Sequence, residues 1–413
     1  MKKINILCIA ILMCYLLVSC SEKKVEERNV TTDFEGVINY SYYFNEAGML
    51  ICNKDRLMYS DWQDVEFNYV CTNPICEHTA DDCTAITLSE AERENGKDTF
   101  VIEYGGKLII FEKSVSYETE LVDTDKIRST EKYYTNVYEA ELDGSNRKHK
   151  LSMEGATLSD LMTSGVIVVG GQAWLGGPKE CVTVTTYTTD SLGNEDVDTT
   201  YEYKDAVYCV DLVEYTVNEY ATIEDNTSIN HSIQFSVYDN HLYYIKKASS
   251  ANKTFIGHID LLTRTNNQLL EIESDAYQIG ALGNCFIYEN ESKIEYIDLT
   301  KPKETKVLDI PNTELGVIAD VVGDKLAVLT SYTKINDAYE IEYTFYDEEF
   351  NEVEKHTYND YFIFWENIGD RIIYVKPFAK QQMWYKETDD LDDLLEGATY
   401  IGSFLGTEHD TID

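Results

Sequence analysis

The sequence predicts an all-β protein, a β-propeller of about seven four-stranded blades, with six or eight blades as alternatives. The first observation is composition: the 413 residues include 32 Tyr and only 5 Pro, and Tyr, Val, Ile and Thr favour strands. The second is a hairpin pattern that recurs along the chain. The third is the absence of any sustained amphipathic helical pattern, although the acidic segment 389–396 has the length for one or two helical turns.

The recurring unit is a turn with Gly, Asn or Asp followed by a short apolar strand. Seven segments fit, the last of them loosely: KDRLMY (54–59), GGKLII (105–110), DNHLYY (239–244), GNCFIY (283–288), GDKLAV (323–328), GDRIIY (369–374) and SGVIVV (164–169). Their turns lie 40 to 75 residues apart, a period typical of propeller blades, whereas a β-sandwich would not repeat one hairpin so often. We expect segment 34–45 to help close the ring against the C-terminal strands.

A second strand follows many of these runs and often ends in an acidic residue and Leu. The examples are VYEAELDG (137–144), AVYCVDL (206–212), FIGHIDL (255–261) and KIEYIDL (293–299). Since a single sheet of this composition cannot cover both of its own faces, radial stacking of blades is the arrangement that buries them.

Two insertions, 113–135 and 178–203, interrupt the repeat. The second alternates in period two on both sides of SLGNE, which predicts a long hairpin that projects from the disc. It is either a partner-binding element or an insertion that binds nothing. If the hairpin turns near residue 195, Cys181 and Cys209 lie opposite each other, which predicts a possible cross-strand disulfide.

The first twenty residues have the pattern of a bacterial lipoprotein signal. Lys2 and Lys3 precede an apolar run that ends in Leu-Val-Ser-Cys at 17–20, and this run is too short for a transmembrane helix. We expect a signal peptide over 1–19, a lipidated Cys20 with a polar tether over 20–33, and the propeller domain over 34–413. The alternative is an ordinary signal peptide. Two acyl chains suffice for stable attachment, so we expect the extracytoplasmic face of the bacterial cell membrane.

The charge of the chain excludes one class of partner. Lys and Arg number 34 against 75 Asp and Glu, a formal net charge of −41. Such a surface repels the phosphate backbone, so we expect no nucleic acid partner. The expected partners are the membrane, through the lipid anchor, and a protein or glycan ligand.

A cysteine-rich motif lies near the predicted first blade. Cys71, Cys76, His78 and Cys83 form the pattern C-x4-C-x-H-x4-C. Three interpretations remain open: a disulfide outside the cytoplasm, a structural zinc site with four donors within 13 residues, and buried thiols that act as small apolar groups. The motif occupies the place of the turn that follows the second strand in other units. We expect it to stabilise the first blade without a part in catalysis.

The lipobox, the strand-turn repeats and the C-x-x-P-x-C-x-H-x4-C pattern together resemble a family of uncharacterised lipoproteins of anaerobic Gram-positive gut bacteria. Cys71, Pro74, Cys76, His78 and Cys83 match this pattern position by position. The resemblance implies a TolB-like or related β-propeller, and it implies no substrate or reaction.

No catalytic signature is found: the sequence has no G-x-S-x-G, no H-E-x-x-H, no P-loop and no dinucleotide-binding glycine pattern. The catalytic residues are therefore predicted as none. The main hypothesis is a binding or scaffolding module, and the alternative is a propeller hydrolase or lyase of glycans or peptides. Aromatic runs supply candidate binding residues: SYYF (41–44), KYY (132–134), YFIFW (361–365) and MWY (383–385). The acidic segments 123–125 and 190–196 are weak candidates for calcium, with solvated surface as their expected role.

Overall fold

The computed structural model describes residues 34–39, 42–53, 56–63, 65–78, 83–89, 98–155, 166–189, 195–225, 233–248, 253–302, 304–310, 313–335, 338–377, 382–388 and 390–403. The predicted signal peptide, Cys20 and the tether lie outside these residues. Residues Thr32–Asp413 form one compact unit, which is the unit described below. In the described part of the chain, no helix has the length and apolar character needed to cross a membrane.

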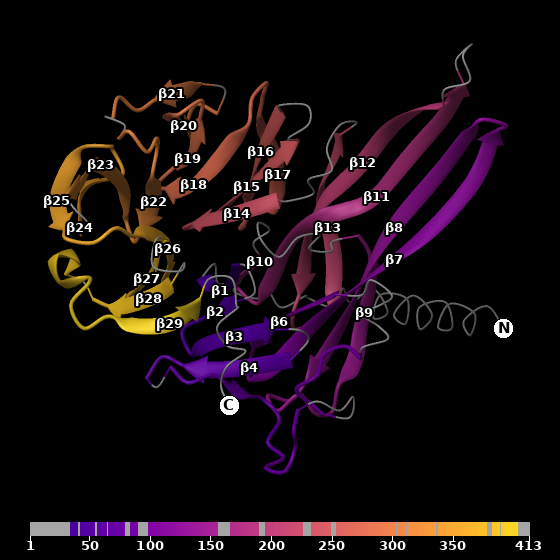
Figure 1. The fold of residues 1–413 in the computed structure, drawn as a ribbon, viewed down its shortest axis with the longest axis horizontal. Helices are drawn as coiled ribbons and strands as arrows, with labels where there is room; N and C mark the ends of the chain where they lie inside the picture. Colours follow the sequence, from indigo (N-terminus) through magenta and orange to yellow (C-terminus); the bar gives the residue numbers. More distant parts are fainter. Residues whose placement is uncertain are drawn as a thin grey trace, which may run out of the picture. The chain divides into compact units, whose positions relative to one another are not determined.

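Four separate antiparallel sheets follow one another in the C-terminal half, and their strands pair in chain order (Figure 1). The first comprises β14 (Ile233–Tyr238), β15 (His241–Ala248), β16 (Lys253–Asp260) and β17 (Thr265–Ile272). The second comprises β18 (Ala276–Leu282), β19 (Cys285–Asn290), β20 (Lys293–Asp298) and β21 (Thr305–Val307). The third comprises β22 (Ala319–Val322), β23 (Lys325–Ile335), β24 (Ala338–Tyr346) and β25 (Glu352–Tyr358). The fourth comprises β26 (Ile363–Ile368), β27 (Arg371–Lys376), β28 (Gln382–Glu387) and β29 (Thr399–Ser403).

The remaining strands belong to one 13-stranded sheet. They are β1 (Phe34–Asn39), β2 (Tyr42–Phe44), β3 (Gly48–Asn53), β4 (Arg56–Asp61), β5 (Asn68–Tyr69), β6 (Asp98–Tyr104), β7 (Lys107–Asp123), β8 (Lys126–Ala140), β9 (Lys148–Glu154), β10 (Val166–Val169), β11 (Gln172–Thr189), β12 (Glu195–Asp211) and β13 (Thr216–Asp225). Within it, β2–β5, β6–β9 and β10–β13 each pair in chain order, and we call each such set of four a meander.

The all-β propeller arrangement is confirmed, but seven separate four-stranded blades are not present. The described residues form five sheets, four of them four-stranded. The reason is that β1 pairs with both β2 and β10, and that β8 pairs with β11 between the two inserted hairpins. These additional ladders join the three meanders by backbone hydrogen bonds. Between the four separate sheets, by contrast, the described residues show contacts made by side chains and no strand pairing.

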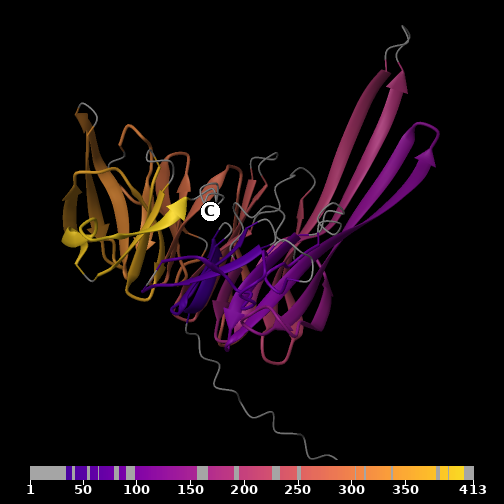
Figure 2. The same ribbon diagram turned by 60° about the horizontal axis from the view of Figure 1, so that its bottom comes forward.

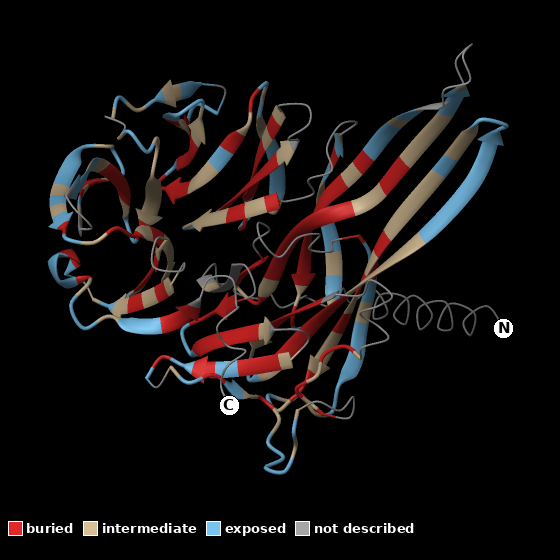
Figure 3. Cartoon of the chain, in the orientation of Figure 1, coloured by how far each residue is buried: buried red, intermediate tan, exposed pale blue. Residues whose placement is uncertain are grey.

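The first strand of each separate sheet lies next to the first strand of the next one, in the order β14, β18, β22 and β26, and β10 contacts β14. Figure 1 shows these strands facing the middle of the ring. The hydrophobic core is divided into clusters that fill the spaces between successive sheets. Stacking in this manner buries both faces of each sheet. Long buried runs lie on the second strand of each separate sheet, as on β19 and β27 (Figure 3).

Side-chain packing joins the two ends of the described chain. Phe44 on β2 meets Trp365 on β26 edge-on at 5.8 Å between ring centroids. Trp62 contacts the ring of Tyr385 at 5.0 Å, and the Tyr385 hydroxyl donates to the Trp62 carbonyl. The expectation that segment 34–45 closes the ring is therefore correct for β2. It is wrong for β1, which pairs with β10 and β2 and with no C-terminal strand.

Two turn types explain the repeated sequence patterns. The turn between the first and second strand of several meanders places Gly in the left-handed region, as at Gly323 and Gly369 with φ of 61°, where a Cβ would be strained. After the third strand, an Asp carboxylate accepts turn N–H groups: Asp260 accepts from Leu262 and Thr263, and other Asp residues do the same. This requirement accounts for the recurring Asp-Leu ending.

The long hairpin predicted over 178–203 is confirmed, and 113–135 forms a second one (Figure 2). We call these two segments together the arm. The predicted pair of Cys181 and Cys209 is not formed, because the ladder places Cys181 opposite Tyr203 and Cys209 opposite Trp174. The partner of Cys181 in the ladder lies six residues before Cys209, so the two thiols are apart and belong to different core clusters. The acidic segment 389–396 contains one 3-10 turn, η1 (Leu391–Asp393).

Candidate functional site

A pocket of about 600 Å³ lies between the meander β2–β5 and the meander β6–β9. The residues that line it are Ala47, Leu50, Tyr59, Ser60, Asp61, Glu66, Asn68, Tyr69, Val70, Thr72, Glu103, Leu108, Leu142 and Asp143. They come from β3 to β7, from the turns next to these strands, and from the turn between β8 and β9. The pocket therefore depends on how the first two meanders dock.

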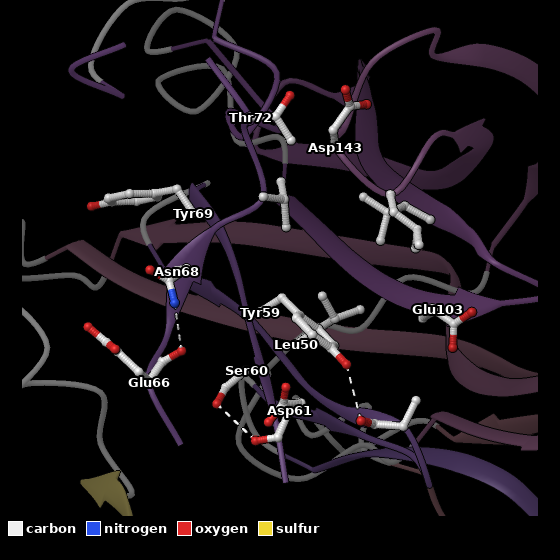
Figure 4. Close-up of a pocket in the computed structure, with 14 residues that line it drawn as sticks. Leu50, Tyr59, Ser60, Asp61, Glu66, Asn68, Tyr69, Thr72, Glu103 and Asp143 are labelled. Atoms are coloured by element: carbon white, nitrogen blue, oxygen red, sulfur yellow. Dashed lines mark hydrogen bonds between the residues drawn. The ribbon is translucent and has the colours of Figure 1, made fainter. Parts of the chain in front are cut away.

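The pocket is acidic and aromatic. Figure 4 shows the carboxylates of Asp61, Glu66, Glu103 and Asp143 placed around it. Among the described residues that line it there is no Lys, Arg or His. Partial burial, followed by the charges of Asp61 and Glu103, raises the pKa of Tyr59, so the phenol stays neutral at pH 7. The floor is apolar, because Leu50, Val70 and Leu108 are buried.

Two of these carboxylates are held in place by the backbone around them. Glu103 accepts from the Asn45 amide at 2.7 Å and from the Gly106 N–H at 2.9 Å. Hydrogen bonds from the side chain and the backbone N–H of Ser145 lower the pKa of Asp143, with a smaller contribution from Thr72. Both side chains are therefore fixed acceptors that point into a preformed space.

The cysteine motif forms a loop directly beside this pocket. The structure corrects its place in the repeat: the loop follows β5 and leads to β6, whereas the turn after the third strand is 62–67. Asn73 and Pro74 begin a tight turn in which the Cys76 N–H donates to the Asn73 carbonyl at 3.1 Å. Pro at the second position of such a turn has a suitable fixed φ. Residues 70–72 lead from the pocket wall into this loop.

The structure brings all four predicted residues of the motif together. The Sγ atoms of Cys71, Cys76 and Cys83 and a ring nitrogen of His78 all lie within 4.8 Å of one another. His78 Nδ1 is 3.4 Å from Cys83 Sγ, and the His78 N–H donates to Cys76 Sγ at 3.4 Å. His78 has a left-handed backbone with φ of 55°, which turns its ring back toward Cys76 although only one residue separates them.

The thiols of this cluster differ in environment. Burial raises the pKa of Cys83 to about 11. A hydrogen bond from the Asn73 N–H, followed by one from Thr84, lowers the pKa of Cys71. None of the seven cysteines in the described residues forms a disulfide, so neither Cys71 nor Cys76 is bonded to Cys83.

The second meander holds the cysteine loop from the other side. Arg147 donates to the carbonyls of Thr87 and Ile86 at 2.8 and 3.0 Å. Gly144 lies so close to the loop that a Cβ there would be 2.0 Å from the Thr84 carbonyl oxygen. Its φ of 75° also requires glycine. The loop thus connects the first two meanders at the pocket.

A different pair of acids lies on the inner strands. Asp320 on β22 is beside Glu366 on β26, and burial together with the Glu366 charge raises the pKa of Asp320 well above its usual range. An acid that keeps its proton next to a second carboxylate is a feature of several hydrolase sites. We therefore retain it as a second candidate site.

The other predicted sites receive no support among the described residues. The acidic turn 123–125 belongs to no group of three possible metal ligands, since the cysteine cluster is the one such group found in the described part of the chain. Residues 190–194 lie outside it. The aromatic runs proposed as binding residues are mostly core: Tyr42, Phe362 and Phe364 are buried.

Sequence analysis missed the pocket residues because they come from separate elements. Tyr59 is part of a repeat run and looked like an ordinary strand residue. Glu66 and Asn68 lie within a few residues of the cysteine motif, and that proximity was the available signal. Glu103 and Asp143 join them only through the docking of the second meander.

Comparisons with known proteins give no family and no function. No family model matches the chain, and no curated protein matches it. Solved structures with a related arrangement include Sqt1 of Saccharomyces cerevisiae, with a TM-score of 0.38, 10% identity and coverage of 87% of this chain and 82% of that one. BamB of Moraxella catarrhalis has a TM-score of 0.34 at 7% identity, covering 83% and 90%.

Dipeptidyl peptidase 4 of Porphyromonas gingivalis has a TM-score of 0.36 at 9% identity and covers 91% of this chain. The chain spans 60% of the length of that protein. These similarities are too low to carry an argument about activity, so the function must be inferred from the site itself.

Proposed function

We propose that this protein is a cell-surface lipoprotein that acts as a propeller binding or scaffolding module for a protein ligand. The lipobox at 17–20 supports attachment through Cys20 to the extracytoplasmic face of the cell membrane. Metabolic labelling with a palmitate analogue tests the anchor. The native chain is tagged and Cys20→Ala is not; equal labelling of both would exclude lipidation.

We also propose that the propeller consists of seven blade units. The four separate sheets supply four units, and the three meanders of the 13-stranded sheet supply the others. The support is that strands pair in chain order within every one of these sets.

The acidic, tyrosine-containing pocket is the observation that carries the binding function. Four carboxylates around an apolar floor, with Tyr59 and Tyr69 among the lining residues, suit a cationic side chain with an aliphatic stem. Lys and Arg have this form, and their charge is attracted by carboxylates and by aromatic faces. The ligand class is therefore an exposed Lys or Arg of a protein or peptide. Glycans are the other class that tyrosine-lined pockets accept.

Calorimetric titration of the full-length chain in detergent tests this function. The probes are blocked tripeptides that contain one Lys, one Arg or one Glu, together with neutral and amino-sugar oligosaccharides. The Lys and Arg peptides bind and the Glu peptide does not. If only the neutral oligosaccharides bind, the ligand class is a glycan and not a peptide. If none of the probes binds, the proposed binding function is wrong.

Glu66→Gln identifies the pocket as the binding site. The side chain is exposed at the pocket edge, and loss of one nearby charge weakens binding of the Lys or Arg peptide by about twofold to fivefold. The matched control is Glu349→Gln, an exposed acid in the β24–β25 turn. Equal loss in both variants would indicate a general charge effect and exclude the pocket.

The pair Asp320 and Glu366 favours the alternative, an extracytoplasmic hydrolase or lyase that acts on glycans or peptides. The raised pKa of Asp320 favours its protonated form, which is the form that a general acid requires. Screening of the native chain against glycan and peptide substrates, with Asp320→Asn as the comparison, tests this. An activity that Asp320→Asn abolishes would establish the enzyme, and no turnover would leave the binding module.

A further inference from the structure

We propose that Cys71, Cys76, His78 and Cys83 bind one Zn²⁺ ion, and that this metal holds the pocket wall formed by residues 68–72. The second part rests on the proposed binding function, whereas the metal site itself does not.

The donor set fits zinc. Three thiolates and one imidazole form a Cys₃His set, a common closed tetrahedral site for this ion. The soft sulfur ligands select against calcium and magnesium, which take oxygen. His78 offers Nδ1 to the centre, and the ring of Tyr69 stacks on it at 4.3 Å.

The distances fit as well. With Zn–S of about 2.3 Å and Zn–N of about 2.0–2.1 Å at tetrahedral angles, sulfur and nitrogen are separated by about 3.6 Å and two sulfurs by about 3.8 Å. His78 Nδ1 and Cys83 Sγ are 3.4 Å apart, and all four donors lie within 4.8 Å of one another. The widest donor separations therefore need to shrink by at most about 1 Å for the four donors to bind one ion.

The local backbone supplies the arrangement that a metal loop needs. The N–H of His78 donates to the sulfur of Cys76, and the Asn73 side chain accepts from the Ile75 N–H at 3.2 Å. Hydrogen bonds of N–H groups to a ligand sulfur stabilise its thiolate. The left-handed φ at His78 is a conformation that side chains other than glycine rarely adopt, and here it accompanies the approach of the His78 ring to Cys83.

A disulfide explains this cluster less well. A single disulfide bond would join two of the three sulfurs. It would give no role to the third thiol or to the imidazole, although both lie beside it. Zinc uses all four donors at once. Cys83 is buried, and Cys71, Cys76 and His78 are partly buried, which matches a closed structural site and does not match an open catalytic one.

The metal acts on the pocket through residues that belong to both sites. Tyr69 and Thr72 line the pocket, Cys71 lies between them in sequence, and Tyr69 stacks on His78. Because a structural metal gives its binding free energy to folding, loss of the ion loosens this wall first. The cores between successive separate sheets contain none of these residues and stay folded, whereas Tyr69 also packs against the core between the first meander and the fourth separate sheet.

Metal analysis of the full-length chain, purified in detergent without chelator, tests the site. The native chain contains about one Zn²⁺, and Cys76→Ser and Cys83→Ser contain close to none. The matched control is Cys285→Ser, a buried free thiol on β19, which keeps the ion. His78→Ala, compared with His149→Ala on β9, weakens zinc retention against a competing chelator.

Replacement of zinc by Co²⁺ gives a second readout that does not depend on stability. The Co²⁺ form shows the intense visible absorption of a tetrahedral thiolate site, and this absorption is lost in Cys76→Ser and kept in Cys285→Ser. A non-reduced digest completes the test. A disulfide among Cys71, Cys76 and Cys83, no zinc after reconstitution of the reduced chain, or zinc retained by all the variants would each overturn the proposal.

Hydrogen exchange with and without a chelator tests the effect on the wall. Removal of zinc increases exchange in peptides that cover 68–78 and leaves β18–β20 unchanged. If the chain binds zinc but its removal leaves exchange over 68–78 unchanged, the metal site stands and its role in holding the pocket wall is wrong. None of these measurements depends on peptide binding. The proposed metal site can therefore be wrong while the proposed binding function is correct, and the binding function can be wrong while the metal site is correct.

Discussion

The four separate sheets and the 13-stranded sheet are built from the same meander, yet they hold together in different ways. In the described residues, the separate sheets meet mainly through apolar side chains, such as Tyr243 and Phe286, whose rings stack at 5.2 Å. Side-chain hydrogen bonds add to this packing, as from Gln278 to the Phe235 carbonyl. In the 13-stranded sheet, β1 and the β8–β11 ladder add backbone hydrogen bonds between meanders. The cysteine loop adds a third connection there.

This difference indicates where function lies. The turns between the first and second strands of the separate sheets are short, although β28 and β29 are joined by a longer connection that contains η1. The departures that add strands or extend them, namely β1 and the arm, lie in the 13-stranded sheet, and so does the cysteine loop. The pocket lies beside the cysteine loop. A propeller scaffold thus supports a site through the segments that interrupt its repeat.

The largest effect is expected from truncation of a core side chain between two separate sheets. Phe286 is fully buried, and Phe286→Ala should lower the free energy of unfolding by about 3–5 kcal/mol, because a cavity remains. Chemical denaturation measures it. The matched control is Leu262→Ala, whose side chain is 61% exposed. Comparable losses in both would contradict the view that these sheets are joined by their apolar cores.

Gly144→Ala tests the contact between the cysteine loop and the second meander. The added Cβ meets the Thr84 carbonyl, and the left-handed φ adds strain, so we expect a loss of about 2–3 kcal/mol. Gly105 has φ of 59° with nothing within 4 Å, and Gly105→Ala should cost only about 1 kcal/mol. If Gly144→Ala and Gly105→Ala lower the free energy of unfolding equally, measured by thermal or chemical unfolding, then the close approach of Gly144 to Thr84 does not contribute to stability.

The separate sheets also carry a histidine that should make them sensitive to acid. Burial, followed by the charge of His241, lowers the pKa of His258 to about 4. In the unfolded chain this histidine takes up a proton near pH 6.5, whereas in the folded chain it does so only near pH 4. Stability therefore falls as the pH drops from about 6.5 toward 4, by at most about 1.4 kcal/mol per pH unit.

His258→Gln should reduce this acid sensitivity in unfolding experiments between pH 4 and 7. His356 provides the opposite sign: burial opposes its charge, but hydrogen bonds with Glu354 and Asp392 raise its pKa. Its stabilisation is present below the unfolded pKa and is lost as the pH rises through the folded one, so His356→Gln should matter most in acid. A His258→Gln profile that matches the native profile would refute the assignment.

The smallest effect is expected on the arm. Leu121 is 70% exposed near the end of β7, and Leu121→Ser should change the free energy of unfolding by about 0.5 kcal/mol or less. Chemical denaturation measures it beside Phe286→Ala. A loss larger than about 1 kcal/mol would mean that the arm end is packed against another part of the protein.

The sequence predicted the fold class and most of the strands, because turn chemistry and apolar runs are local. GDKLAV and GDRIIY correspond to β23 and β27, each preceded by a left-handed Gly. In the first meander the same turn lies at 45–48, where the Asn45 side chain accepts the N–H groups of Ala47 and Gly48. The sequence analysis placed it one strand later, since no left-handed glycine marks it.

Local sequence patterns could not predict the number of sheets, the strand register that sets the partners of Cys181 and Cys209, or the pocket. The additional ladders depend on β1 reaching β10, a contact across more than a hundred residues. A strand register that differs by six residues from the predicted one separates Cys181 from Cys209. The cysteine motif, by contrast, was found from its sequence because its four donors are close along the chain. Local patterns were predictable, and docking between meanders was not.

Hydrogen exchange of the full-length chain with and without the Lys-containing tripeptide is the most direct test of where function lies. Our account predicts protection in peptides that cover 57–72, 103–108 and 142–143, with no change from β14 to β29. Protection around Asp320 and Glu366, with none in the first two meanders, would contradict it and place the site on the inner strands of the separate sheets.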